Sequence, residues 1–158
     1  AAILASGFMQ ELSKRQFVVT WGMVAKVPFF NSLDAEKIAE IAALLKPWAV
    51  PARYTVIRRG EAADCMYFIV SGDVEVDLPP NSFHLTTGEY FGEMGIVSRS
   101  ARVANVISIT ECQLLILQAR DLNRLLEDNP ALAAELTELT ERRLAGSESS
   151  ERNDHKEP

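Results

Sequence analysis

The feature that most constrains this chain is a change in the spacing of its apolar residues. From Lys46 to Gln118, apolar and polar residues alternate in short runs separated by turn-forming residues such as Pro51, Gly60 and Gly72. Alternation with a period of two predicts half-buried strands, because successive side chains of a strand point to opposite faces. Many short strands with regular turns favour a closed antiparallel barrel or jelly roll. The expected strands are Trp48–Val50, Tyr54–Arg58, Met66–Val70, Val74–Leu78, Phe83–Leu85, Val103–Ile107 and Cys112–Leu117.

Helical spacing flanks this region on both sides. Before it, Phe17–Val27 carries apolar residues three and four positions apart, and Asp34–Leu45 has one apolar face with Asp34 as its expected cap. After it, helices are expected over Ala119–Glu127 and Pro130–Leu144, whereas Ser147–Pro158 is polar and is expected to be disordered. The chain therefore reads as an α+β fold in the order helix, barrel, helix.

Composition excludes several classes of function. The 158 residues are 47% apolar, which suits one compact domain with appendages, and the net charge of −6 argues against binding of nucleic acid or an anionic membrane. Cys65 and Cys112 lack the spacing of a metal site, so we expect no metal and two buried, reduced thiols in a cytosolic protein. Ala1–Gly7 lacks a basic leader and is too short to span a bilayer.

The stretch Gly88–Val106 has the composition of an anion cradle. Its glycines allow tight turns and close approach of the backbone to a ligand, and they stand at Gly88, Gly92 and Gly95. A short helix opening at Phe91–Gly95 would direct unpaired N–H groups at a phosphate. Arg102 would add a forked, permanently charged donor.

Glu93 does not fit a simple phosphate site, because a carboxylate repels a phosphate. It fits if it faces a group that needs an acceptor, such as a sugar hydroxyl. Taken singly, a turn glycine, a glutamate in a first helical turn and a lone arginine are all more often structural than functional. Their combination indicates a phosphate next to a ribose, and hence a nucleotide.

The motif F-G-E, followed nine positions after Glu93 by R-x-A-x-V, resembles the phosphate-binding cassette of the cyclic-nucleotide-binding domain. Catabolite-activator-type regulators, kinase regulatory subunits and cyclic-nucleotide-gated channels share that domain. The resemblance covers roughly Phe17–Leu144. It implies an eight-stranded antiparallel β-roll, jelly-roll-like, with N-terminal helices and C-terminal B- and C-helices.

The resemblance also implies roles for individual residues. The backbone of Gly92–Gly95 and the Arg102 side chain would hold the cyclic phosphate, Glu93 would accept the ribose 2′-hydroxyl, and Val76 would line the base. The family often has Ser or Thr where this chain has Val103, which implies a preference for cAMP, with cGMP bound more weakly. The expected binding residues are Val76, Phe91, Gly92, Glu93, Met94, Gly95, Arg102, Val103, Arg142 and Arg143.

The last two of these belong to the expected C-helix. Leu132, Leu136 and Leu139 form an apolar stripe whose next position is Arg143, and in related channels an arginine near this point folds over the purine. Arg142 lies about 100° round the helix and is expected to face solvent. An arginine that only covers the leucine face is the alternative.

The two ends of the chain bear on which branch of the family it resembles. Residues 1–16 look like the close of a pore-lining helix with its linker, residues 17–145 like the binding domain, and residues 146–158 like a disordered tail. The resemblance to bacterial cyclic-nucleotide-gated potassium channels implies a cytoplasmic sensor of an inner (plasma) membrane protein. It also implies a homotetramer with the channel's transmembrane domain, and a monomer or dimer for the isolated domain.

Other functions have less support in the sequence. A catabolite-activator-type regulator would need a basic DNA-binding module, and a kinase-type regulatory subunit would need an inhibitor sequence upstream; both stay open as alternatives. An enzyme is not expected, since His84 and His155 have no visible nucleophile partner and nucleotide-turnover motifs are missing. The Arg58–Arg59 pair is interpreted as a solvated flank of a turn.

Overall fold

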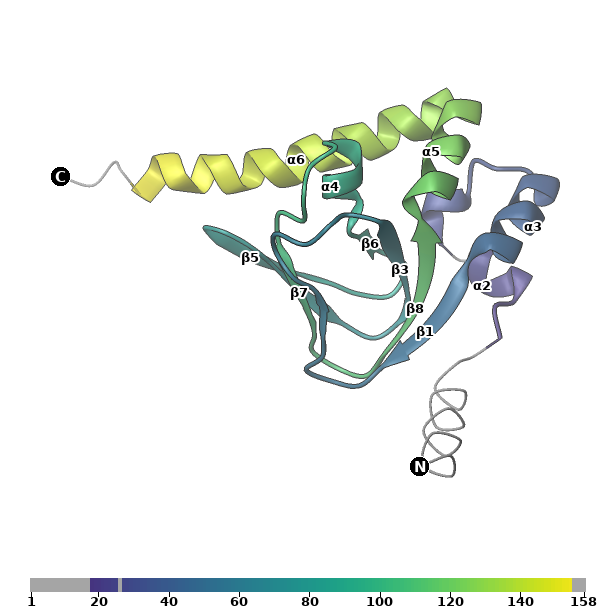
Figure 1. Ribbon diagram of the computed structural model, residues 1–158, viewed down its shortest axis with the longest axis horizontal. Helices are drawn as coiled ribbons and strands as arrows, with labels where there is room; N and C mark the ends of the chain where they lie inside the picture. The colour runs from purple at the N-terminus through teal and green to yellow at the C-terminus, as the bar shows by residue number, and fades with distance from the viewer. Residues whose placement is uncertain (1–17, 26, 155–158) are drawn as a thin grey trace.

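The computed structural model describes residues 18–25 and 27–154 (Figure 1). Short helices come first, strands follow, and two helices close the chain, with the long last helix lying across the top of the strands in Figure 1. The strands are antiparallel and form a roll of two four-stranded sheets, which confirms the expected fold class.

In the described part of the chain, three short helical segments precede the first strand. They are α2 (Trp21–Ala25), the 3-10 helix η1 (Pro28–Phe30) and α3 (Ala35–Leu44). The helix expected from Phe17 to Val27 is shorter, because the Thr20 hydroxyl accepts a hydrogen bond from the Met23 N–H at 3.2 Å and caps a helix that begins at Trp21. Phe17 lies outside the described residues. Asp34 caps α3 as expected, since its Oδ1 accepts from the Lys37 N–H at 2.8 Å.

The two sheets pack face to face with strand orders β1-β8-β3-β6 and β2-β7-β4-β5. The first contains β1 (Lys46–Val50), β8 (Cys112–Gln118), β3 (Cys65–Ser71) and β6 (Tyr90–Phe91). The second contains β2 (Thr55–Ile57), β7 (Asn105–Ser108), β4 (Val74–Leu78) and β5 (Asn81–Leu85). Strand β4 alternates buried and half-buried residues, as a strand with one covered face should. In β3, Cys65 to Ile69 are all buried, because one face meets the roll interior and the other meets the helices.

Apart from Val74–Leu78, each expected strand differs from the structure by one or two residues at one or both ends, and two differences bear on the site. Strand β6 was not expected, since two residues are too few to show an alternation. The strand expected over Val103–Ile107 begins instead at Asn105, because the backbone of Arg102 is hydrogen-bonded to the turn after β2 rather than to a sheet. Between these two strands lies the short helix α4 (Glu93–Val97).

The C-terminal helices are α5 (Ala119–Asp128) and α6 (Pro130–Asp154). Helix α6 contacts α5, α4 and β5. The prediction of a disordered segment from Ser147 is wrong as far as Asp154, because propagating an existing helix is much less costly than starting one. Cys65 and Cys112 are buried free thiols, as expected. No helix in the described part of the chain is both long and apolar enough to cross a membrane.

Two apolar cores hold the domain together. The first lies between the helices and the outer face of β3 and β8, and it includes Phe29, Phe30, Phe68, Leu132 and Leu136. The second fills the roll, and it includes Ile69, Val74, Val76, Phe91 and Leu114.

Candidate functional site

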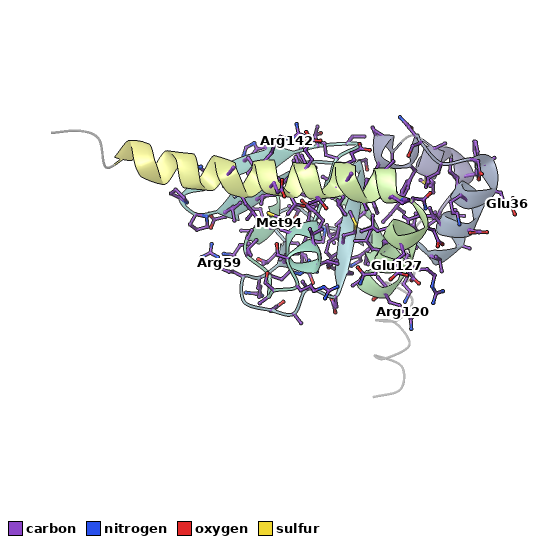
Figure 2. All side chains as sticks on the ribbon, turned by 90° about the horizontal axis from the view of Figure 1, so that it is seen from above. Glu36, Arg59, Met94, Arg120, Glu127 and Arg142 are labelled. Atoms are coloured by element: carbon purple, nitrogen blue, oxygen red, sulfur yellow. The ribbon has the colours of Figure 1, made fainter. Side chains whose placement is uncertain are left out.

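A cavity of about 320 Å³, counting its space open to solvent, lies between the roll, α4 and α6. Val76 from β4, Phe83 from β5, Phe91 from β6 and Met94 from α4 give it apolar walls. Figure 2 shows the view onto α6, with Met94 labelled beside the helix. Arg102 and Arg143 supply its charged lining. An apolar cavity with a few fixed polar groups is the usual form of a small-molecule site.

Arg102 places a buried positive charge in this cavity. Its side chain is 5% exposed, and its Nη1 and Nη2 donate to the carbonyls of Gly92 and Cys65, each at 2.7 Å. The carboxylate that pairs with it within the described chain, Asp64, lies 3.7 Å away and is 78% exposed, so water screens it. A guanidinium has five N–H donors, and these bonds leave some of them unused. A buried charge with so weak a counter-ion favours an anionic ligand.

Glu93 lies fully buried behind the cavity wall. Its Oε1 accepts a hydrogen bond from Arg143 Nη1 at 2.6 Å, whereas its Oε2 is buried without a hydrogen-bond partner in the described part of the chain. Burial raises the pKa of this carboxyl group, and the positive charge of Arg143 opposes that effect. A buried carboxylate oxygen without a donor is suited to accept a hydroxyl group.

Arg143 ties α6 to the site. Besides Glu93, it donates from Nη2 to the Tyr90 carbonyl at 2.9 Å. Its guanidinium carbon lies 5.4 Å from the centre of the Tyr90 ring and 5.8 Å from that of Phe83, within the range of cation–π attraction. These polar and aromatic contacts therefore hold α6 at Arg143 beside the cavity.

Two glycines shape the start of α4. Gly92 precedes the helix with a φ of +89°, where other residues are strained, and a Cβ there would lie 3.0 Å from Arg102 Nη1. Gly95 has a further role that the sequence did not reveal. A Cβ at Gly95 would lie 2.6 Å from the Ala63 Cβ, so a glycine here lets α4 pack against the connection between β2 and β3.

The structure brings most of the expected site residues together. Those that line the cavity are Val76, Phe91, Gly92, Met94, Gly95, Arg102, Val103 and Arg143. Glu93 does not line it but reaches it through Arg143. Arg142 is exposed and lines a neighbouring hollow between β5 and α6, so Arg143 is the arginine placed at the cavity.

Sequence reasoning missed four lining residues, Ile57, Phe83, Ala104 and Val106. A signal for two of them was present. In the register of β4 with its neighbours, Val76 pairs with Phe83 on one side and with Val106 on the other. Once Val76 was assigned to the base, antiparallel pairing across the turn at Pro79–Pro80 would have placed Phe83 beside it.

Comparison with known proteins agrees with this geometry. Residues 47–129, more than half of the chain, match the family model of the cyclic nucleotide-binding domain. The chain belongs to this family. A cyclic nucleotide-gated potassium channel of Rhizobium etli is 39% identical over 146 residues, covering 92% of this chain and 41% of the channel. A CRP-like cAMP-activated global transcriptional regulator of Mycobacterium tuberculosis is 27% identical over 128 residues, covering 77% of this chain and 57% of the regulator.

Among solved structures, the cyclic nucleotide-binding domain is similar to cAMP-bound PfPKA-R (141–441). The TM-score is 0.70 at 19% identity, with 88% of this chain and 47% of that chain covered, which shows a shared fold. The chain spans 35% to 41% of the length of three related bacterial potassium channels. These relatives are channels and regulators rather than enzymes.

Proposed function

We propose that this cyclic nucleotide-binding domain is a cAMP sensor and that the cavity at Arg102 is its binding site. Arg102 and the backbone of Gly92–Gly95 would hold the cyclic phosphate, and Glu93 would accept the ribose 2′-hydroxyl. The apolar walls, including Val76 and Phe91, would enclose the base. Arg143 would cover the ligand from α6.

The observation that supports this proposal is a buried donor that lines the cavity, Arg102, together with a buried acceptor, Glu93, that lies between the lining residues Gly92 and Met94. Arg102 has unused N–H donors and a screened counter-ion, which suits a phosphate. Glu93 Oε2 has no hydrogen-bond partner among the described residues, which suits a sugar hydroxyl. A cyclic nucleotide presents both groups next to each other.

A preference for cAMP over cGMP rests on Val103. This side chain lines the cavity and carries no hydroxyl group, so it has nothing to offer the guanine amino group. A Thr in its place would supply a hydrogen-bonding group.

We further propose that the domain regulates a potassium-channel pore in a longer, homotetrameric membrane protein. Residues 1–16 would link it to the transmembrane domain, residues 17–145 would form the sensor on the cytoplasmic side, and residues 146–158 would form a tail. Helix α6 touches both cores: Leu132 and Leu136 pack in the core of the N-terminal helices, and Leu144, next to the cavity residue Arg143, packs against the core of the roll. A ligand that binds better to one position of α6 would therefore shift the packing of the N-terminal helices.

A catabolite-activator-type regulator is the second candidate, favoured by the likeness to the Mycobacterium tuberculosis protein. A kinase-type regulatory subunit shares only the fold. The gene around this sequence decides among them, since transmembrane helices with a potassium filter before Ala1 would identify a channel. A basic helix-turn-helix after the domain would identify a DNA-binding regulator.

Calorimetry with cAMP tests the binding site directly. Arg102→Ala should weaken binding by about 2–5 kcal/mol, because a charge-assisted contact with the phosphate is lost. Arg120→Ala, which removes an exposed arginine of α5, should leave the affinity unchanged. Wild-type affinity in a well-folded Arg102→Ala protein would refute the proposed site.

A further inference from the structure

The Arg58–Arg59 pair that follows β2 is not a uniform solvated flank. Arg59 donates from its side-chain Nε to the Val103 carbonyl at 3.2 Å, and from its backbone N–H to Asn105 Oδ1 at 2.8 Å. The Arg58 side chain makes no hydrogen bond or ion pair within the part of the chain that the structure describes. Figure 2 labels Arg59 at the edge of the roll. The two adjacent arginines therefore differ in their contacts, since the side chain of Arg59 makes a hydrogen bond and that of Arg58 makes none within the described residues.

Arg59 begins the segment 59–65, which comprises most of the β2–β3 connection and the first residue of β3, and which contacts Arg102 at several points. The Gly60 N–H donates to the Arg102 carbonyl at 2.9 Å, and the Arg102 N–H donates to the Glu61 carbonyl at 2.8 Å. Further along, the Cys65 carbonyl accepts from the Arg102 guanidinium. The segment 59–65 therefore binds the backbone N–H and the backbone carbonyl of Arg102, and it also binds the guanidinium at the end of the Arg102 side chain.

The side-chain hydrogen bond from Arg59 fixes the residue after Arg102, which is Val103. Strand β7 begins only at Asn105, so Arg102 and Val103 precede its sheet pairing. A side-chain donor from Arg59 binds the Val103 carbonyl there, while the Val103 side chain lines the cavity. We propose that Arg59 is a positioning residue, which holds Arg102 and Val103 in the orientation that binds a cyclic nucleotide. This inference rests on the proposed function of the cavity.

The positive charge of Arg59 is not expected to contribute much to holding Arg102 and Val103 in place. Arg59 Nη2 lies 3.9 Å from Asp77 Oδ2, and both side chains are about half exposed, at 44% and 50%. Exposed pairs of this kind contribute little, and salt screens them. The hydrogen bond from Nε therefore distinguishes Arg59 from its neighbour. Lysine tests this distinction, because it keeps the positive charge but has a methylene group where arginine has Nε–H.

Hydrogen exchange on the ligand-free domain tests the hold without any nucleotide. Arg59→Ala should speed amide exchange in a peptide covering residues 100–106 by about three- to tenfold, the scale of one net hydrogen bond. Arg59→Lys should behave like Arg59→Ala, and Arg58→Ala should behave like the wild type. Equal exchange in all four proteins would overturn the inference.

Stopped-flow binding of cAMP to the same proteins tests the consequence. Arg59→Ala and Arg59→Lys should release cAMP about three- to tenfold faster at both low and high salt, with Arg58→Ala unchanged. A contrary outcome is that Arg58→Ala and Arg59→Ala slow association equally, with wild-type association restored in Arg59→Lys or at high salt. Arg59 would then act through its long-range charge, and the inference would be wrong. Faster exchange with unaltered release would also overturn it. Absence of cAMP binding by the wild type would refute the proposed function, and the exchange result would still decide whether Arg59 holds this segment.

Discussion

The proposed base preference rests on a single side chain, that of Val103. It lines the cavity directly after Arg102, and its methyl groups cannot hydrogen-bond a guanine amino group. Val103→Thr should narrow the preference for cAMP over cGMP by about 1 kcal/mol, the scale of one added neutral hydrogen bond. Competition binding with the two nucleotides measures this, and a wild-type protein that already prefers cGMP would contradict the interpretation.

Glu93 makes the stability of the domain depend on pH. Burial raises the pKa of its carboxyl group above the ordinary value of 4.5. Between pH 4.5 and that raised pKa, the folded protein holds a proton that the unfolded chain has released. The free energy of unfolding therefore falls as the pH rises through this window, by up to about 1.4 kcal/mol per pH unit.

Glu93→Gln should remove this fall, because an amide does not titrate. Urea unfolding of both proteins from pH 4.5 upward measures the difference. Glu36→Gln, which alters an exposed glutamate of α3, should keep the wild-type slope. Parallel curves for wild type and Glu93→Gln would show that Glu93 is not the group responsible.

At the scale of elements, α4 is placed by its contact with the β2–β3 connection. Gly95→Ala would put a methyl group 2.6 Å from the Ala63 Cβ and 3.1 Å from the Ser100 carbonyl oxygen. We expect a loss of about 1–3 kcal/mol in unfolding free energy. Adding Ala63→Gly should restore part of it, since it removes the closer contact, and additive losses in the double variant would exclude this packing explanation.

Arg143 joins helix α6 to the cavity through its hydrogen bonds to Glu93 and to the Tyr90 carbonyl. Arg143→Ala removes the bonds to Glu93 and the Tyr90 carbonyl, so cAMP should leave about ten- to a hundredfold faster, as expected for about 1–3 kcal/mol. Association should change little, because the phosphate is captured first. Arg142→Ala is the matched control, since that side chain is exposed on the same helix. If Arg142→Ala speeds cAMP release more than Arg143→Ala in stopped-flow traces, Arg142 rather than Arg143 is the residue that retains the ligand.

At the scale of the whole molecule, the two cores meet through α6. Leu132 and Leu136 lie in the helical core, while Leu144 packs against the core of the roll. A ligand that holds α6 in place should therefore stabilise the domain as one unit. At one hundred times Kd, cAMP should add about 2.7 kcal/mol and raise the midpoint of thermal unfolding by about 5–10 °C. At the same cAMP concentration, Arg102→Ala should lower this stabilisation to less than about 1 kcal/mol, and a wild-type midpoint that does not respond to cAMP would contradict the prediction.

The sequence by itself determined the class of fold and the chemical character of the site. Local sequence patterns can be recognised without knowledge of the tertiary contacts. Such patterns are the alternation along Val74–Leu78, the cap at Asp34 and the cluster Gly92–Arg102. The sequence predicted the ends of helices less well. Helix α6 continues past its expected end at Leu144, because adding residues to an existing helix costs little and no proline follows Leu144 within the helix.

Only the tertiary structure decided which side chains meet. That Glu93 pairs with Arg143, fifty residues away, depends on how α6 lies over α4, and one residue of helix rotation would have presented Arg142 instead. Gly95 faces Ala63, and Arg59 holds Val103, through contacts that carry no signal along the chain. Hydrogen bonds and close packing act over a few ångströms in space, so residues far apart in sequence become partners only when the fold brings them together.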